Sequence, residues 1–140
     1  MTTAIDSNVI LALWDVEESL HRPARAALDN AQRRGSLVIS GAVYGELLAG
    51  PGRREAFVDK FCSETQIEVE WRIGENIWRA AGGAFQNYMV RRRREGRAGA
   101  RRILTDFVIG AHALVSGYKL LTLDAGVYRA SFPRLEIVTT

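Results

Sequence analysis

The sequence ILTDFVIGAHALVSGYKLLTLD, residues 103–124, decides the fold. Apolar residues from Val108 to Leu114 recur at helical spacing, and Thr105 is suited to cap the start of that helix. The apolar run from Lys119 to Thr122 is typical of a buried strand, and Asp124 follows it. A helix that leads into a buried strand is the building unit of an α/β protein.

The same alternation runs through the rest of the chain. Strands are predicted at Thr3–Asp6, Leu37–Ile39, Ile67–Trp71 and Leu135–Val138. Helices are predicted after Asp6, from Pro23 to about Gly35, from Ser40 to the Gly50-Pro51-Gly52 stop, over Arg53–Glu64 and over Gly74–Arg94, with a mobile loop at residues 95–102. This order predicts an α/β fold, a three-layer α/β/α sandwich around a central, mainly parallel sheet.

Composition is that of one folded domain over residues 1–140. Hydrophobic residues make up 47% and charged residues 25%, which is typical of globular proteins and excludes disordered or fibrous classes. No apolar run approaches the roughly 18 residues of a membrane span, and the N-terminus lacks the basic region of a signal peptide. We therefore expect a cytoplasmic protein with no membrane partner. One cysteine, Cys62, and two histidines exclude the usual Cys/His zinc site.

Positive charge is concentrated in one stretch. Of the 19 basic residues, 17 are arginine, and the net charge is +3. Residues 91–102 hold seven arginines against Glu95, a net +6, so the remaining chain carries −3. Such a block is either a solvated face or a polyanion-binding surface. Because guanidinium groups pair bidentately with phosphate, we predict contact with a phosphate-bearing polyanion by Arg91, Arg92, Arg93, Arg94, Arg97, Arg101 and Arg102.

Four carboxylates are candidates for chemistry. Asp6 and Asp124 follow strands, so a parallel sheet brings both to one edge, while Asp106 opens a helix and Glu46 lies beside the apolar stripe of its helix. Each acid alone is explained by helix capping or partial exposure. Several acids at one edge would instead repel one another unless a cation such as Mg²⁺ or Mn²⁺ neutralised them. The joint interpretation is a divalent-metal site that hydrolyses a phosphodiester.

The order of motifs resembles the PIN-domain ribonucleases, and most of all the VapC toxins of bacterial toxin–antitoxin pairs. The resemblance rests on Asp-Ser-Asn at 6–8, a helical Glu46, ILTDFVIGAHAL at 103–114, LLTLD at 120–124 and FPRLEI at 132–137. It implies that Asp6, Glu46, Asp106 and Asp124 are the metal-binding and catalytic acids, and that Ser7, Asn8 and Thr122 support them.

The resemblance further implies a magnesium-dependent endoribonuclease toxin, frequently a homodimer, that a cognate antitoxin inhibits. Many family members carry a further acid two residues after the position of Asp124, and here that residue is Gly126. We therefore expect one firm Mg²⁺, replaceable by Mn²⁺, and a second ion only with help from an RNA phosphate.

Other interpretations remain open at this level. A phosphate-accepting receiver domain also gathers acids at strand ends, but it needs a lysine at a late strand end and Lys119 begins its strand. The chain is alternatively a PIN-like nuclease that is not a toxin, or a basic RNA-binding or interaction module without catalysis. Among the remaining side chains, Tyr128 and Phe132 are expected to close the core, and Trp14, Trp71 and Trp78 to pack in the core or a dimer interface.

Overall fold

A computed structural model describes residues 1–97 and 99–139, and its centre is a parallel sheet of five strands. The strands are β1 (Thr2–Ile5), β2 (Ser36–Ser40), β3 (Ile67–Glu70), β4 (Lys119–Leu121) and β5 (Ile137–Val138). Their order across the sheet is β3-β2-β1-β4-β5, and every neighbouring pair is parallel. The predicted α/β sandwich is confirmed, with a sheet that is parallel throughout.

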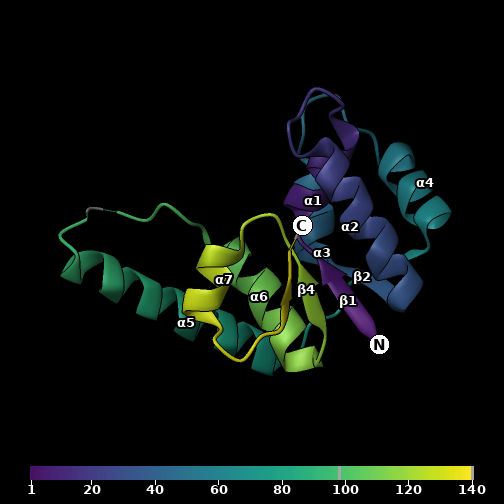
Figure 1. Ribbon diagram of the computed structural model, residues 1–140. Helices are drawn as coiled ribbons and strands as arrows, with labels where there is room; N and C mark the ends of the chain where they lie inside the picture. The colour runs from purple at the N-terminus through teal and green to yellow at the C-terminus, as the bar shows by residue number, and fades with distance from the viewer. Residues whose placement is uncertain (98, 140) are drawn as a thin grey trace.

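Helices cover both faces of the sheet (Figure 1). They are α1 (Ser7–Trp14), α2 (His21–Arg34), α3 (Gly41–Leu48), α4 (Glu55–Thr65), α5 (Glu75–Arg94), α6 (Leu104–Ser116) and α7 (Ala125–Ser131). From β1 the chain moves outward through β2 to β3, then returns to β4 on the other side of β1. Because parallel crossovers are right-handed, this reversal places α1–α4 on one face and α5–α7 on the other.

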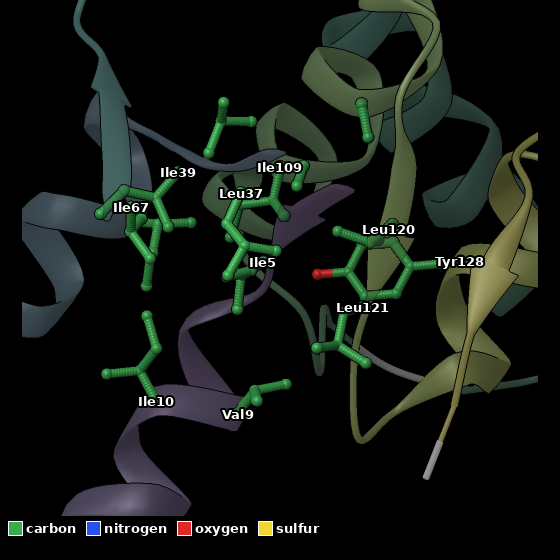
Figure 2. Packing of buried hydrophobic residues seen from close by; sticks show 14 of the residues in the cluster. Ile5, Val9, Ile10, Leu37, Ile39, Ile67, Ile109, Leu120, Leu121 and Tyr128 are labelled. Carbon is green, nitrogen blue, oxygen red and sulfur yellow. The ribbon is translucent and has the colours of Figure 1, made fainter. Parts of the chain in front are cut away.

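The core lies on both sides of the central strands (Figure 2). Ile5, Ile39 and Leu120 are at most 1% exposed, as expected for a parallel sheet that is covered on both faces. Gly110 in α6 matters for this packing, because a side chain there would collide with the ring of Phe132. The glycine thus allows the segment that follows α7 to close over α6.

Three local features differ from the predictions or were not predicted. Helix α6 begins at Leu104 with Ile103 as its N-cap residue, so Thr105 is not the cap. Helix α7 was not predicted, because it is short and contains Gly126 in its first turn. Trp71 and Trp78 are 63% and 52% exposed, which rejects the core alternative for them and leaves the dimer interface as the prediction. The spacing of apolar residues within one helix or strand does not show which of its faces the rest of the chain covers.

None of the helices within residues 1–97 and 99–139 is long and apolar enough to cross a bilayer.

The strand order creates one crevice. Strands β1 and β4 are neighbours, yet the connections that leave them run to opposite faces of the sheet. In parallel sheets, ligands bind beyond the carboxyl ends of two such strands. The residues that follow β1 and β4 are Asp6 and the segment Thr122–Asp124.

Candidate active site

Asp6 is the buried acid of this crevice. Its backbone N–H donates to Leu121 O at 2.9 Å, which continues the β1–β4 pairing, and its side chain is almost inaccessible, the residue being 5% exposed. Oδ2 accepts hydrogen bonds from Thr122 Oγ1 at 2.9 Å and from the Tyr128 hydroxyl at 2.8 Å. Asp6 occupies the N-cap position of α1 but makes no side-chain capping bond. The hydrogen bonds to its Oδ2 therefore come from the crevice side, from Thr122 and Tyr128.

Glu46 approaches Asp6 from α3. The Ser7 hydroxyl donates to Glu46 Oε1 at 2.8 Å and lies 3.5 Å from Asp6 Oδ1. Ser7 is buried and Glu46 is half-buried. One hydroxyl thus bridges two carboxylates that lie 40 positions apart in the sequence.

Thr122 connects the start of α1 and the end of β4 through hydrogen bonds. Its hydroxyl donates to Asp6 and accepts from Asn8 Nδ2 at 3.4 Å and from the Asp124 N–H at 3.0 Å. Asn8 Oδ1 in turn accepts the Leu123 N–H at 3.2 Å. A hydroxyl has one donor and two acceptor positions, so that of Thr122 is fully used. Ser7 and Thr122 therefore contact the acids directly, whereas the Asn8 side chain contacts Thr122 and the Leu123 N–H.

Burial sets the electrostatics of the two inner acids. It raises the pKa of Asp6, and the nearby charge of Asp106 adds to this, although hydrogen bonds from Thr122 and Tyr128 oppose it. The pKa of Glu46 is also raised, first by burial and then by the charges of Asp6 and Asp106, against the Ser7 hydrogen bond. The acids therefore affect one another, and ionising all of them together is costly without a cation.

Asp106 and Asp124, the other two predicted acids, have partners of their own. Asp106 Oδ2 accepts the Ile103 N–H at 3.2 Å, and Asp124 Oδ2 is ion-paired with Arg102 Nη2. Within residues 1–97 and 99–139, no three His, Cys, Asp or Glu side chains lie close enough together to hold a metal ion. The chemistry of the donor set does fit Mg²⁺ or Mn²⁺, since every acid supplies hard carboxylate oxygens and two have raised pKa values. An ion that took both oxygens of either acid would displace the partner that Oδ2 now has.

Tyr128 is the residue whose role the sequence analysis missed. It was expected in the core and is indeed 2% exposed, but its hydroxyl also holds Asp6. Figure 2 shows the hydroxyl pointing from the α7 side toward the central strands. Burial, together with the Asp6 carboxylate, raises the pKa of Tyr128, so the phenol keeps its proton and acts as a donor. No local signal marks this residue, because α7 itself was not predicted.

The arginine block divides into different environments. Helix α5 projects from the sheet and the following loop runs back toward the crevice (Figure 1). Arg92 is buried and its Nε donates to Gly99 O, Arg91 donates to Ser131 Oγ at 3.1 Å, and Arg93 and Arg94 are exposed. A cavity of about 370 Å³ is lined by Tyr88, Val127, Ala130, Glu95 and the arginines 91, 92, 97, 101 and 102. Arg102 joins this cavity to the acids through Asp124.

Comparison with known proteins identifies the class. The PIN domain family matches residues 3–133, so the chain belongs to that family. PIN domains are generally nucleases that depend on a divalent metal. No curated protein matches the chain significantly by sequence.

Solved structures share the fold over nearly the whole chain. A chain from VapBC2 of Rickettsia felis bound to promoter DNA has a TM-score of 0.70 at 16% identity, covering 99% of this chain and 98% of that one. A toxin–antitoxin complex from Klebsiella pneumoniae gives 0.67 at 20% identity, with 98% and 96% covered. VapBC-1 from nontypeable Haemophilus influenzae gives 0.67 at 17% identity, with 99% and 98% covered. The resemblance to PIN domains stated from the sequence is confirmed.

We predict that Asp6→Asn stabilises the metal-free protein at neutral pH. When folding raises the pKa of a carboxyl, the protein becomes less stable as the pH rises from the ordinary pKa through the raised pKa. In this pH range the folded state binds more protons than the unfolded state. The Asn variant removes this loss, so its gain in Tm should be present at about pH 7.5 and shrink toward about pH 4. A gain of about 1 kcal/mol corresponds to roughly 3–4 °C for a chain of this size.

Thermal unfolding in EDTA across this pH range measures the effect. Asp29→Asn, which changes an exposed acid on α2, is the matched control and should show no such trend. A Tm difference between Asp6→Asn and wild type that does not depend on pH would contradict the assigned electrostatics.

Proposed function

We propose that the protein is a magnesium-dependent endoribonuclease that hydrolyses RNA phosphodiester bonds as the cytoplasmic toxin of a toxin–antitoxin pair. The observation that carries the catalytic part is the pair of acids Asp6 and Glu46, bridged by Ser7 at the switch point of the sheet. Buried, mutually repelling carboxylates lower stability, which is the usual signature of a functional site.

The chain's own residues have distinct tasks in this proposal. Asp6, Glu46, Asp106 and Asp124 would hold the ion, and Mn²⁺ would substitute for Mg²⁺ because both prefer oxygen ligands. When bound, the metal supplies an activated water and stabilises charge on the phosphate. Thr122 and Tyr128 keep Asp6 fixed by donating to Oδ2, and Ser7 orients Glu46. Asn8 holds the β4–α7 turn that carries Asp124.

The arginine block would supply the RNA contact. Arg93 and Arg94 are exposed at the end of α5, and Arg91, Arg97, Arg101 and Arg102 line the cavity beside the acids. Arg92 is buried and holds the loop backbone, so it would act by shaping this surface. Phosphate contacts of this kind position RNA without reading its sequence.

The toxin role is supported by the VapBC structures that share the fold. A free ribonuclease would damage its own cell, so a cognate antitoxin protein should cover the acids. A homodimer is part of the proposal, and exposed Trp71 and Trp78 leave apolar surface for it. The alternative, a PIN-like nuclease that is not a toxin, has the same site and differs only in its partner.

We predict that Asp6→Asn or Asp106→Asn abolishes RNA cleavage in Mg²⁺ while the fold is kept. An amide is neutral and cannot replace an ionised oxygen ligand, so activity should fall by about 100-fold or more. Cleavage of labelled RNA with purified protein measures this, and Asp29→Asn should cut like the wild type. Near wild-type cleavage by either site variant would remove that residue from the catalytic set.

We predict that Arg93→Gln/Arg94→Gln weakens RNA binding and makes it less dependent on salt. Each lost phosphate contact should lower the slope of log affinity against log salt by roughly 0.7 for single-stranded RNA. Binding should be measured on the Asp6→Asn background to prevent cleavage. The control Arg22→Gln/Arg25→Gln removes the same charge from exposed positions on α2. Equal slopes in both double variants would assign the block to solubility.

We predict growth arrest when the chain is expressed alone in a bacterial host. Arrest should disappear with Asp6→Asn and be relieved by co-expression of the small gene that neighbours this one. Growth curves with matched expression levels measure both effects. A harmless wild type that nevertheless cuts RNA in Mg²⁺ would reject the toxin role and leave a PIN-like nuclease.

A further inference from the structure

Arg102 forms an ion pair with one of the four acids. Its Nη2 contacts Asp124 Oδ2, and the two side chains are 36% and 41% exposed, so the pair lies at the open rim of the crevice. Arg102 precedes α6 by two residues and Asp124 directly precedes α7. The contact therefore joins the loop after α5 to the end of β4, across 22 residues of sequence.

The surroundings of the guanidinium are also acidic. Asp106 opens the helix that follows Arg102, and its charge acts on Arg102 as well. On its other side Arg102 lines the arginine cavity. Arg102 thus lies between two carboxylates, Asp106 and Asp124, and the arginines that line the cavity.

Resting on the proposed function, we infer that Arg102 is an internal counter-ion of the active site, which occupies the cation position at Asp124 and is displaced when the divalent metal binds. Asp124 cannot offer both carboxylate oxygens to an ion while Oδ2 is held by the guanidinium, so the two cations compete for that oxygen. In the metal-free state the guanidinium balances the charge of Asp124, which protects the fold from a further unpaired acid.

Displacement also gives Arg102 a second partner. The freed guanidinium remains beside the cavity arginines, where a phosphate group of the substrate would bind, and it suits bidentate phosphate pairing. Loading the metal would thereby release an arginine for RNA. Since coupling between two ligands is reciprocal, RNA that binds Arg102 would in turn favour metal binding.

The first test is calorimetric titration of Mn²⁺ into wild type, Arg102→Gln, Arg102→Lys and Arg129→Gln. Arg129 is an exposed arginine on α7, the helix that follows Asp124, so its variant controls for the lost charge. An exposed ion pair contributes about 0.2–1 kcal/mol, which converts to roughly 1.4- to 5-fold in affinity. Arg102→Gln should bind Mn²⁺ tighter than Arg129→Gln by about this factor, and Arg102→Lys should remain close to wild type.

A second measurement keeps the inference testable if Arg102→Gln does not fold. In ¹⁵N spectra of the wild type, the Arg102 Nε–H signal, assigned by its loss in Arg102→Lys, should shift on adding Mg²⁺ while that of Arg129 does not. Mn²⁺ affinity in Arg102→Gln that equals or falls below that of Arg129→Gln overturns the inference, as does an Arg102 signal unmoved by saturating Mg²⁺. If the wild type still cuts RNA, the proposed function survives that result. A wild type that neither binds metal nor cuts RNA refutes both.

Discussion

The hydrogen bonds to the Asp6 carboxylate connect every part of this crevice. Asp6 is fixed at the end of β1, Thr122 at the end of β4 and Tyr128 on α7, and both hydroxyls donate to the same Oδ2. A buried carboxylate must be satisfied by donors or neutralised, because leaving it unpaired costs several kcal/mol or shifts its pKa. This one requirement fixes how β4 and α7 approach β1, and it explains why a tyrosine hydroxyl lies in an otherwise apolar core.

Burial determines the electrostatics of the two inner acids. Burial raises the pKa values of Asp6 and Glu46, and the charges of Asp6 and Asp106 raise the pKa of Glu46 further. Each of the outer acids has a partner: Asp106 accepts a backbone N–H and Asp124 pairs with Arg102. Solvent exposure therefore increases from the buried Asp6 through the half-buried Glu46 to the partly exposed ion pair at Asp124. Exchange at the rim is the simplest way to admit a cation without disturbing the buried bonds.

The arginines near residue 91 do not act as a uniform surface. Arg92 is buried against the loop that it stabilises, Arg91 reaches α7 through Ser131, and Arg93 and Arg94 remain open to solvent. Only the exposed and cavity-lining members are positioned to meet a polyanion. The arginines of this run therefore have three different positions: one is buried against the loop, several line the cavity, and two are exposed on the surface.

The sequence by itself determined the α/β class and the five strands of the sheet, and it placed Asp6 and Thr122 at strand ends, since apolar periodicity and strand ends are local properties. It did not reveal α7, the start of α6, the exposure of Trp71 and Trp78 or the Arg102–Asp124 pair. These depend on which distant segments meet: Tyr128 reaches Asp6 across 122 residues, and Arg102 reaches Asp124 only because the loop after α5 folds back. Only the tertiary structure decides such contacts, because the free energy of a hydrogen bond or ion pair depends on burial and partners that local sequence does not contain.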